Sequence, residues 1–238
     1  MKFLLVSEVA ERLGVTAQRV RAMLRDGQLH GHRAGGAWFV DEVQLLKPRR
    51  LGRPLSSRNA WAAVLAVPRA GAPGAQSSFD VFWPRPDTEI SLSQPDSSKL
   101  RQRLKRLPGN PGAPQLLSSW LASRSLPITV SAPEPDAMFL DPDLVPTGVS
   151  DARAAMSGGG EAEFYAQPGT LPRVMRRHLL VEDPRGHVIL REAGVRLEVP
   201  VPLLLLAADL ADRGGPREMR RAAELIEKWA QQSRPEPL

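Results

Sequence analysis

Residues 7–42 read SEVAERLGVTAQRVRAMLRDGQLHGHRAGGAWFVDE, and this stretch contains the signals of a small folded unit. Ser7 is placed to cap a first helix, in which apolar residues recur at helical spacing until Gly14. Gly14 can adopt a positive φ and Thr16 can cap a second helix, so the chain between them predicts a tight turn. The pattern therefore predicts two short helices joined by a three-residue turn, which is a helix-turn-helix.

The second helix carries an apolar inner face and a polar outer face. Val20, Met23 and Leu24 fall on the inner face, whereas Gln18, Arg21 and Arg25 recur at i, i+3 and i+7 on the outer one. Arginine pairs with guanine and glutamine with adenine in the major groove, so such a helix is suited to reading bases. The residues expected to contact DNA from this helix and its cap are Thr16, Gln18, Arg19, Arg21 and Arg25.

Two short strands are expected after the helices. The glycine turn at residues 34–36 separates residues 29–33 from residues 37–40, and Trp38 is the large apolar anchor that a hairpin needs. Asp41 is placed to cap a last short helix. The hairpin has the character of a wing, and we expect His32 and Arg33 to position it against DNA.

This order of helix, turn, helix and wing resembles the winged helix-turn-helix of the excisionase and MerR superfamily. The resemblance covers residues 3–47 and follows the pattern S-x-x-A-x-x-L-G-V-T at residues 7–16. It implies a DNA-binding module in a bacterial protein. Many relatives carry an arginine where Ala37 stands here, which implies weaker wing contacts to phosphate.

The excess positive charge lies beside this unit. Residues 1–60 contain 11 Lys/Arg against 5 Asp/Glu, whereas residues 61–238 contain 21 of each. A localised basic region is the electrostatic footprint of a polyanion. Arg49, Arg50 and Arg53 lie in a segment that Pro54 keeps extended, and Gly52-Arg53-Pro54 resembles the centre of an AT-hook with Leu51 in place of its first arginine. Two roles for this segment remain alternatives: an arm that enters the minor groove, and a basic linker that contacts only phosphates.

The rest of the chain is expected to form a mixed helical and small antiparallel-sheet part, so the fold class is α+β. Helices are expected at residues 58–67, 97–107, 116–124, 203–212 and 217–231. Three short β-runs are expected after Arg176, the last of them at residues 195–199, where apolar and charged residues alternate. The expected divisions are a winged helix at 1–47, a basic arm at 48–57, a helical region at 58–135 and an α+β dimerisation or partner-binding domain at 136–238.

No catalytic or metal-binding pattern stands out. The chain has no cysteine, so thiolate metal sites and disulfides are excluded. His30 and His32 lack further ligands at metal-binding spacing, and no nucleophile motif such as G-x-S-x-G occurs. We expect no enzyme and no cofactor. The sequence shows neither a signal peptide nor a membrane span, so the expected location is the cytoplasm, in association with the nucleoid.

These observations favour a sequence-specific regulator of transcription that binds double-stranded DNA, acting as a repressor of its own promoter. A homodimer is expected, because one small winged helix buries little surface on DNA. The final helix and the apolar VPVPLLLLAA segment at 199–208 are the expected association surface. The C-terminal half loosely resembles bacterial abortive-infection-type antitoxins, which implies a toxin or other protein partner as an alternative. A recombination-directionality factor and a ligand-sensing MerR-type activator are further alternatives.

Overall fold

The computed structural model describes residues 3–13, 15–25, 31–35, 37–41, 53–70, 79–83 and 90–232. Its contacts separate two units, Met1–Pro48 and Arg49–Leu238. The expected boundary near residue 135 is not found. Strand β6 (Ile128–Ser131) belongs to one sheet with strands from the last hundred residues, and Trp61 and Trp229 lie in one core.

The first unit contains β1 (Phe3–Leu5), α1 (Val6–Leu13), α2 (Ala17–Arg25), β2 (Gly31–Ala34) and β3 (Ala37–Asp41). The three strands form an antiparallel sheet in the order β1-β3-β2. Strand β1 has no counterpart among the expected elements, because three residues are too few to show alternation. The helix expected after Asp41 lies outside the described residues.

Ser7 is not the cap of the first helix. Helix α1 already begins at Val6, and the Glu8 carboxylate accepts the Leu5 backbone N–H at 2.7 Å, which satisfies a donor that the helix leaves free. The prediction for the second helix is confirmed, since Thr16 Oγ1 accepts the Arg19 N–H at 3.2 Å.

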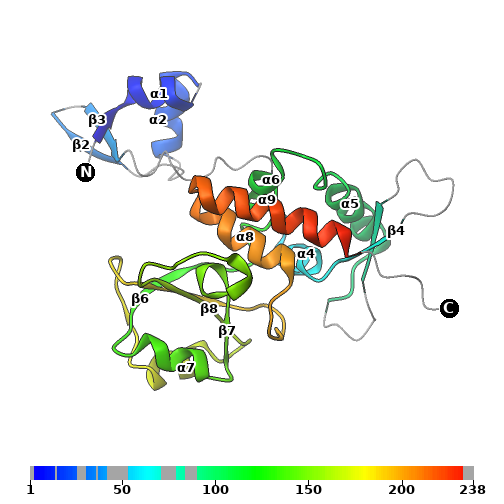
Figure 1. Ribbon diagram of the computed structural model, residues 1–238. Coiled ribbons are helices and arrows are strands. Elements are labelled where there is room, and N and C mark those ends of the chain that lie inside the picture. Colours follow the sequence, from blue (N-terminus) through cyan, green and yellow to red (C-terminus); the bar gives the residue numbers. More distant parts are fainter. Residues whose placement is uncertain are drawn as a thin grey trace, which may run out of the picture. The chain divides into compact units, whose positions relative to one another are not determined.

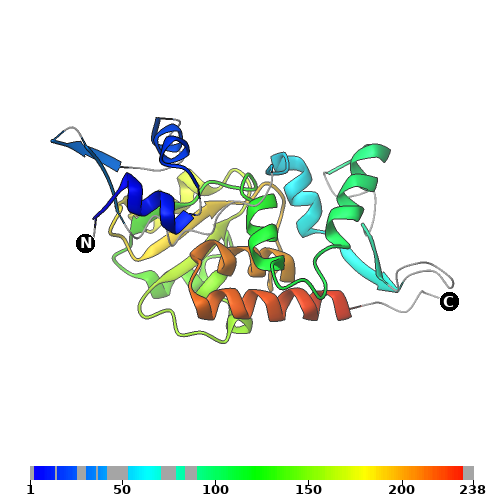
Figure 2. The ribbon, with the colours of Figure 1, turned by 90° about the horizontal axis from the view of Figure 1, so that it is seen from above.

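The second unit begins with helices and a hairpin. It contains α4 (Ser57–Val64), β4 (Val67–Ala70), β5 (Phe79–Phe82), α5 (Gln94–Leu104) and α6 (Ala113–Trp120). Strands β4 and β5 pair antiparallel, and Figure 2 shows this hairpin with α4 and α5 at one end of the long helix α9 (Pro216–Gln231). The Trp229 indole N–H donates to the Ala66 carbonyl at 3.0 Å, which connects α9 to the segment between α4 and β4.

The sheet of this unit has five strands in the order β7-β8-β10-β6-β9. Its further elements are η1 (Pro135–Leu140), β7 (Leu144–Pro146), η2 (Gly148–Ser150), η3 (Ala152–Ala154), β8 (Ala162–Ala166), α7 (Leu171–Arg177), β9 (Val181–Glu182), β10 (Val188–Glu192) and α8 (Leu203–Arg213). The expected α+β class is confirmed, but the sheet is mixed rather than antiparallel. Strands β8 and β10 run parallel, with α7 in the connection between them.

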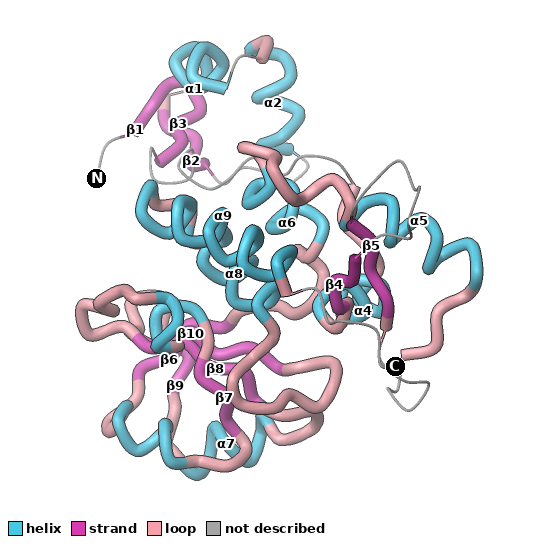
Figure 3. The backbone as a smooth tube through the Cα atoms, turned by 45° about the vertical axis from the view of Figure 1, so that its right-hand side comes forward, coloured by secondary structure: helices cyan, strands magenta, loops and turns pink. Residues whose placement is uncertain are grey.

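Helices cover both faces of this sheet. Figures 1 and 3 show α8 over one face and α7 over the other. Along β8 the side chains alternate accordingly, with Tyr165 in the core that contains α8 and Phe164 in the core that contains α7. Both of these side chains are fully buried.

The strand expected at residues 195–199 does not form. Val195 and Leu197 are buried and Arg196 is exposed, as alternation predicts, but no strand of the described residues pairs with the segment. Instead the Gln167 side-chain amide donates to the Leu197 carbonyl at 2.7 Å and accepts the Leu197 N–H at 3.0 Å. The Gln167 side chain thus provides the hydrogen bonds that a neighbouring strand would otherwise make with the backbone of Leu197.

The expected association surface is also wrong. Residues 203–208 are at most 6% exposed because α8 lies inside the core, between the sheet and the other helices. The apolar face of α9, which includes Leu225, Ile226 and Trp229, packs into the same core. The leucines of α8 and the apolar face of α9 are therefore not available to another chain, whereas Val199 at the start of the segment is 71% exposed.

Candidate nucleic-acid interface

The core of the first unit fixes which face of α2 points outward. Val20 is fully buried, and Leu24 one turn later is 7% exposed, both in a cluster with Val9 and Val40. Across the turn, the Val15 N–H donates to the Ala10 carbonyl at 3.0 Å, which sets the second helix against the first. The opposite face of α2 therefore points away from the core.

Four of the residues expected to contact DNA are exposed on α2 or at its cap. The side chains of Thr16, Gln18, Arg19 and Arg21 are all exposed. Arg25 ends α2, where its backbone belongs to the same helix. The structure thus brings the cap and the Gln/Arg positions together on one helix, in the arrangement that the periodicity predicted.

The wing is the hairpin of β2 and β3. His32 pairs with Phe39 and Arg33 with Trp38, and Gly35 turns the chain with a φ of +55°. A residue with a Cβ is strained at that φ, so the glycine is required by the turn itself. Trp38 is half-buried against the domain core, which makes the hairpin part of the folded unit.

The basic arm is described only in part. Arg49 and Arg50 lie outside the described residues. Arg53 is exposed and belongs to the second unit, ahead of α4, whose N-cap is Ser56.

The first 45 residues match a protein-family model described as "DNA-binding protein Rv2175c, wHTH domain". The N-terminal unit is a winged helix-turn-helix DNA-binding domain. A similar stretch occurs in the probable plasmid-partitioning protein ParA of Thermus thermophilus, which is 50% identical over 46 residues. That match covers 19% of this chain and 14% of the Thermus protein. No solved structure matches the chain.

The second unit contains a buried ionic network that the sequence did not indicate. Arg124 Nη2 lies 2.5 Å from Asp209 Oδ1 and 2.6 Å from Asp212 Oδ2, and the Tyr165 hydroxyl donates to Asp209 at 3.0 Å. Burial by itself lowers the pKa of the Arg124 guanidinium, but the charges of Asp212 and its other partners outweigh burial and raise that pKa well above its usual value. The side chains of Arg124 and Asp209 are at most 1% exposed and that of Asp212 is 28% exposed, so the network connects the chain after α6 with α8 and the sheet and is open to solvent only at Asp212.

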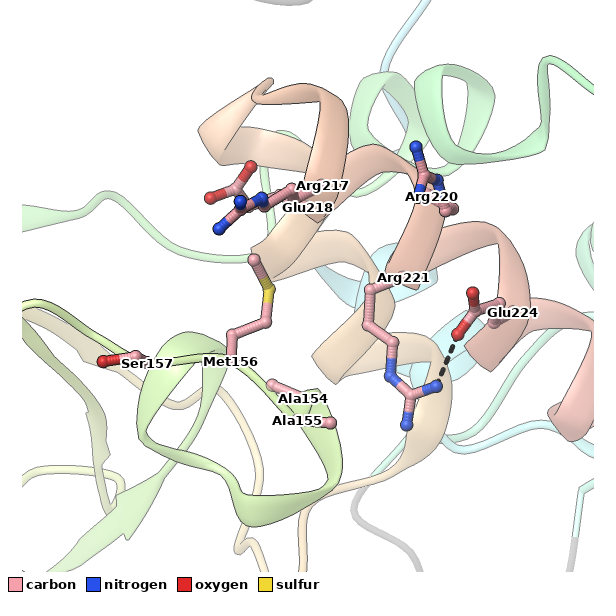
Figure 4. Close-up of a pocket in the computed structure, with 9 residues that line it drawn as sticks. All are labelled: Ala154, Ala155, Met156, Ser157, Arg217, Glu218, Arg220, Arg221 and Glu224. Atoms are coloured by element: carbon pink, nitrogen blue, oxygen red, sulfur yellow. Dashed lines mark hydrogen bonds and ion pairs between the residues drawn. The ribbon is translucent and has the colours of Figure 1, made fainter.

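A pocket of about 450 Å³ lies beside the start of α9. Figure 4 shows Arg221 directed toward Glu224, with Arg217 and Arg220 pointing in different directions. Arg221 is held by Glu224 at 2.5 Å and by the Arg153 carbonyl at 2.7 Å. The arginines do not converge on one ligand position.

Metal-binding and membrane-spanning features are absent from the described part of the chain. It contains no group of three or more His, Cys, Asp or Glu residues that could hold a metal ion. No helix in the same residues is both long and apolar enough to cross a membrane.

Proposed function

We propose that the protein is a sequence-specific regulator of transcription that binds double-stranded DNA and represses its own promoter. The observation that carries the proposal is the outer face of α2, where Gln18, Arg19 and Arg21 are exposed in a domain that matches a DNA-binding family. A helix of this kind enters the major groove with its N-terminal residues toward the bases. Gln18 is placed to read adenine, and Arg21 to read guanine or hold phosphate.

The wing and the arm extend this contact. His32 and Arg33 on β2 would touch the backbone beside the major groove, while Arg49, Arg50 and Arg53 would enter a minor groove or contact phosphates. Each DNA contact adds affinity, whereas selectivity comes from contacts to base edges and from the shape of the DNA.

The test is a titration of the full chain on DNA fragments from its own promoter region. Arg21→Ala and Arg25→Ala should each weaken binding by about 1–3 kcal/mol, and Gln18→Ala should relax the preference at one base pair. Arg220→Ala is the matched control, because it removes an exposed arginine from a helix of the second unit. Unchanged affinity in all three α2 variants, with circular dichroism as in the wild type, would remove α2 from the interface.

A second candidate function is a role in plasmid partitioning, supported by the 46-residue similarity to the Thermus partitioning protein. The location of the bound sites in the host separates the two. Sites at the promoter of the protein's own gene favour a regulator, whereas sites clustered on a plasmid outside promoters favour partitioning.

A further inference from the structure

The second unit exposes a small group of large apolar side chains where two segments meet. Phe139 and Leu140 end η1 and are 45% and 87% exposed, and Leu179 and Val181 lie after α7 at 70% and 65%. The segments touch, because Asp141 accepts hydrogen bonds from Arg177 at 2.6 Å and lies 2.7 Å from the His178 ring nitrogen. We call Phe139, Leu140, Leu179 and Val181 the η1–β9 surface.

Leu179 occupies a backbone position at which leucine is unfavourable. The Leu180 N–H donates to the Met175 carbonyl and the Leu179 N–H to the Arg176 carbonyl, which is the Schellman motif that ends α7. Leu179 has a φ of +50°, and the equivalent position after α8 is Gly214 with a φ of +75°. A side chain in the left-handed region destabilises the fold, and an exposed leucine gains no burial in return.

Two of the four residues, Phe139 and Val181, are also held in place. The Phe139 ring packs edge-on against the buried Phe164 ring at 4.9 Å between centroids, and Val181 is fixed by the pairing of β9 with β6. β9 ends the order of the sheet in the described part of the chain, so its outer edge is open there. Ordered apolar side chains lose little conformational freedom when a partner covers them.

The charges around the surface decide which occupant it suits. Arg176, Arg177 and Arg185 are exposed within four residues of this surface in the sequence, and so are Asp136 and Glu182. A partner of one charge sign would meet repulsion from some of these charges. A second copy would not, because a two-fold axis can place the arginines of each copy against the acids of the other.

We propose that the η1–β9 surface joins two copies of this chain in an isologous dimer. Four apolar side chains supply less than the roughly 800 Å² that each partner of a stable complex buries. The association is therefore weak in solution and concentration-dependent. This step goes beyond the proposed function but would serve it, because two linked winged helices on adjacent half-sites bind far more tightly than one.

Sedimentation velocity of the full chain without DNA tests the proposal. The wild type should move from 26.0 kDa toward twice that mass as its concentration rises to about 100 µM. Leu140→Ser should weaken association about tenfold or more. Leu126→Ser is the matched control, because Leu126 is 82% exposed in the segment between α6 and β6, and it should change nothing.

Leu179→Gly gives the clearest test, because it should stabilise the fold and at the same time weaken association. It should raise the melting temperature by about 2–4 °C by relieving the backbone, and it should weaken association like Leu140→Ser. The proposal is overturned by a wild type that stays monomeric, by equal losses in Leu126→Ser and Leu140→Ser, or by a Leu179→Gly chain that is more stable and still associates. A chain that associates but does not bind DNA would overturn the regulator alone, since Arg21→Ala should leave association intact.

Discussion

At the scale of single residues, Asp209 is a buried side chain at which several polar contacts of the second unit meet. Its carboxylate accepts hydrogen bonds from Arg124, Tyr165 and Thr147, the last at 2.5 Å, and its side chain is completely buried. The partners lie 85, 44 and 62 positions away in the sequence. An aspartate in the middle of a leucine-rich helix indicates that a polar group must meet it, but not which residue supplies that group, so the network could not be predicted.

Asp209→Asn should destabilise the protein by about 3–5 kcal/mol, because it leaves the buried Arg124 guanidinium without its closest carboxylate. Urea unfolding measures the loss. Asp143→Asn is the control: its partners Arg173 and Arg177 are 56% and 43% exposed, so the loss should stay below about 1 kcal/mol. Similar losses in the two variants would show that the Arg124–Asp209 pair adds little.

Asp141 gives the protein an acid-sensitive contact. Burial acts to raise its pKa, but hydrogen bonds from the Asp143 N–H, His178 and Arg177 outweigh burial and hold the pKa below its ordinary value of 3.8. A lowered folded-state pKa means that the stabilisation is complete above the unfolded pKa and is lost as pH falls through the folded one.

Asp141→Asn should therefore destabilise the protein at neutral pH and flatten the fall in stability below pH 3.8. Urea midpoints between neutral pH and the acid range measure both effects. A variant whose acid limb is as steep as that of the wild type would assign the acid sensitivity to other carboxylates.

At the scale of elements, periodicity predicted the long helices well and the short strands poorly. Helices α8 and α9 follow the apolar spacing of residues 203–212 and 217–231 within a residue or so. Strand β1 has three residues and β9 two, which is too short for a pattern. At residues 195–199 alternation predicted the burial of Val195 and Leu197 correctly, but Val199 is 71% exposed and no strand of the described residues pairs with the segment. Side chains alternate wherever the chain is extended, with or without a partner strand.

The cap of α2 is the element-scale feature on which the interface depends. Thr16→Ala should destabilise the first unit by about 1 kcal/mol, because the Arg19 N–H loses its acceptor. Thr16→Ser keeps a hydroxyl and is the control. Thermal melts of the full chain followed by circular dichroism measure the difference. Equal melting of the two variants would mean that the hydroxyl contributes nothing.

At the scale of the whole molecule, the division of charge was readable from the sequence and the pairing of strands was not. The parallel contact of β8 with β10 joins Ala162 to Val188 and Ala166 to Glu192, across an intervening helix and a strand on the sheet edge. No local pattern specifies such a pairing. Sequence alone also does not distinguish a buried helix from an exposed apolar interface, because the two have the same composition. The prediction that residues 199–208 contact a partner fails for this reason at Leu203–Ala208, which are buried.

The charge division leads to a prediction about salt. Replacing Arg49, Arg50 and Arg53 together by glutamine should make the logarithm of DNA affinity fall less steeply with the logarithm of salt concentration, by about 0.9 for each phosphate that the variant no longer neutralises. Replacing Arg196, Arg217 and Arg220 removes the same charge from exposed positions of the second unit. If the arm neutralises phosphates, only the first triple variant should change the slope, because a charge that contacts no phosphate releases no counterions from DNA. Equal slopes in the two triple variants would show that the arm does not touch DNA, since net charge would then account for any shared decrease in affinity.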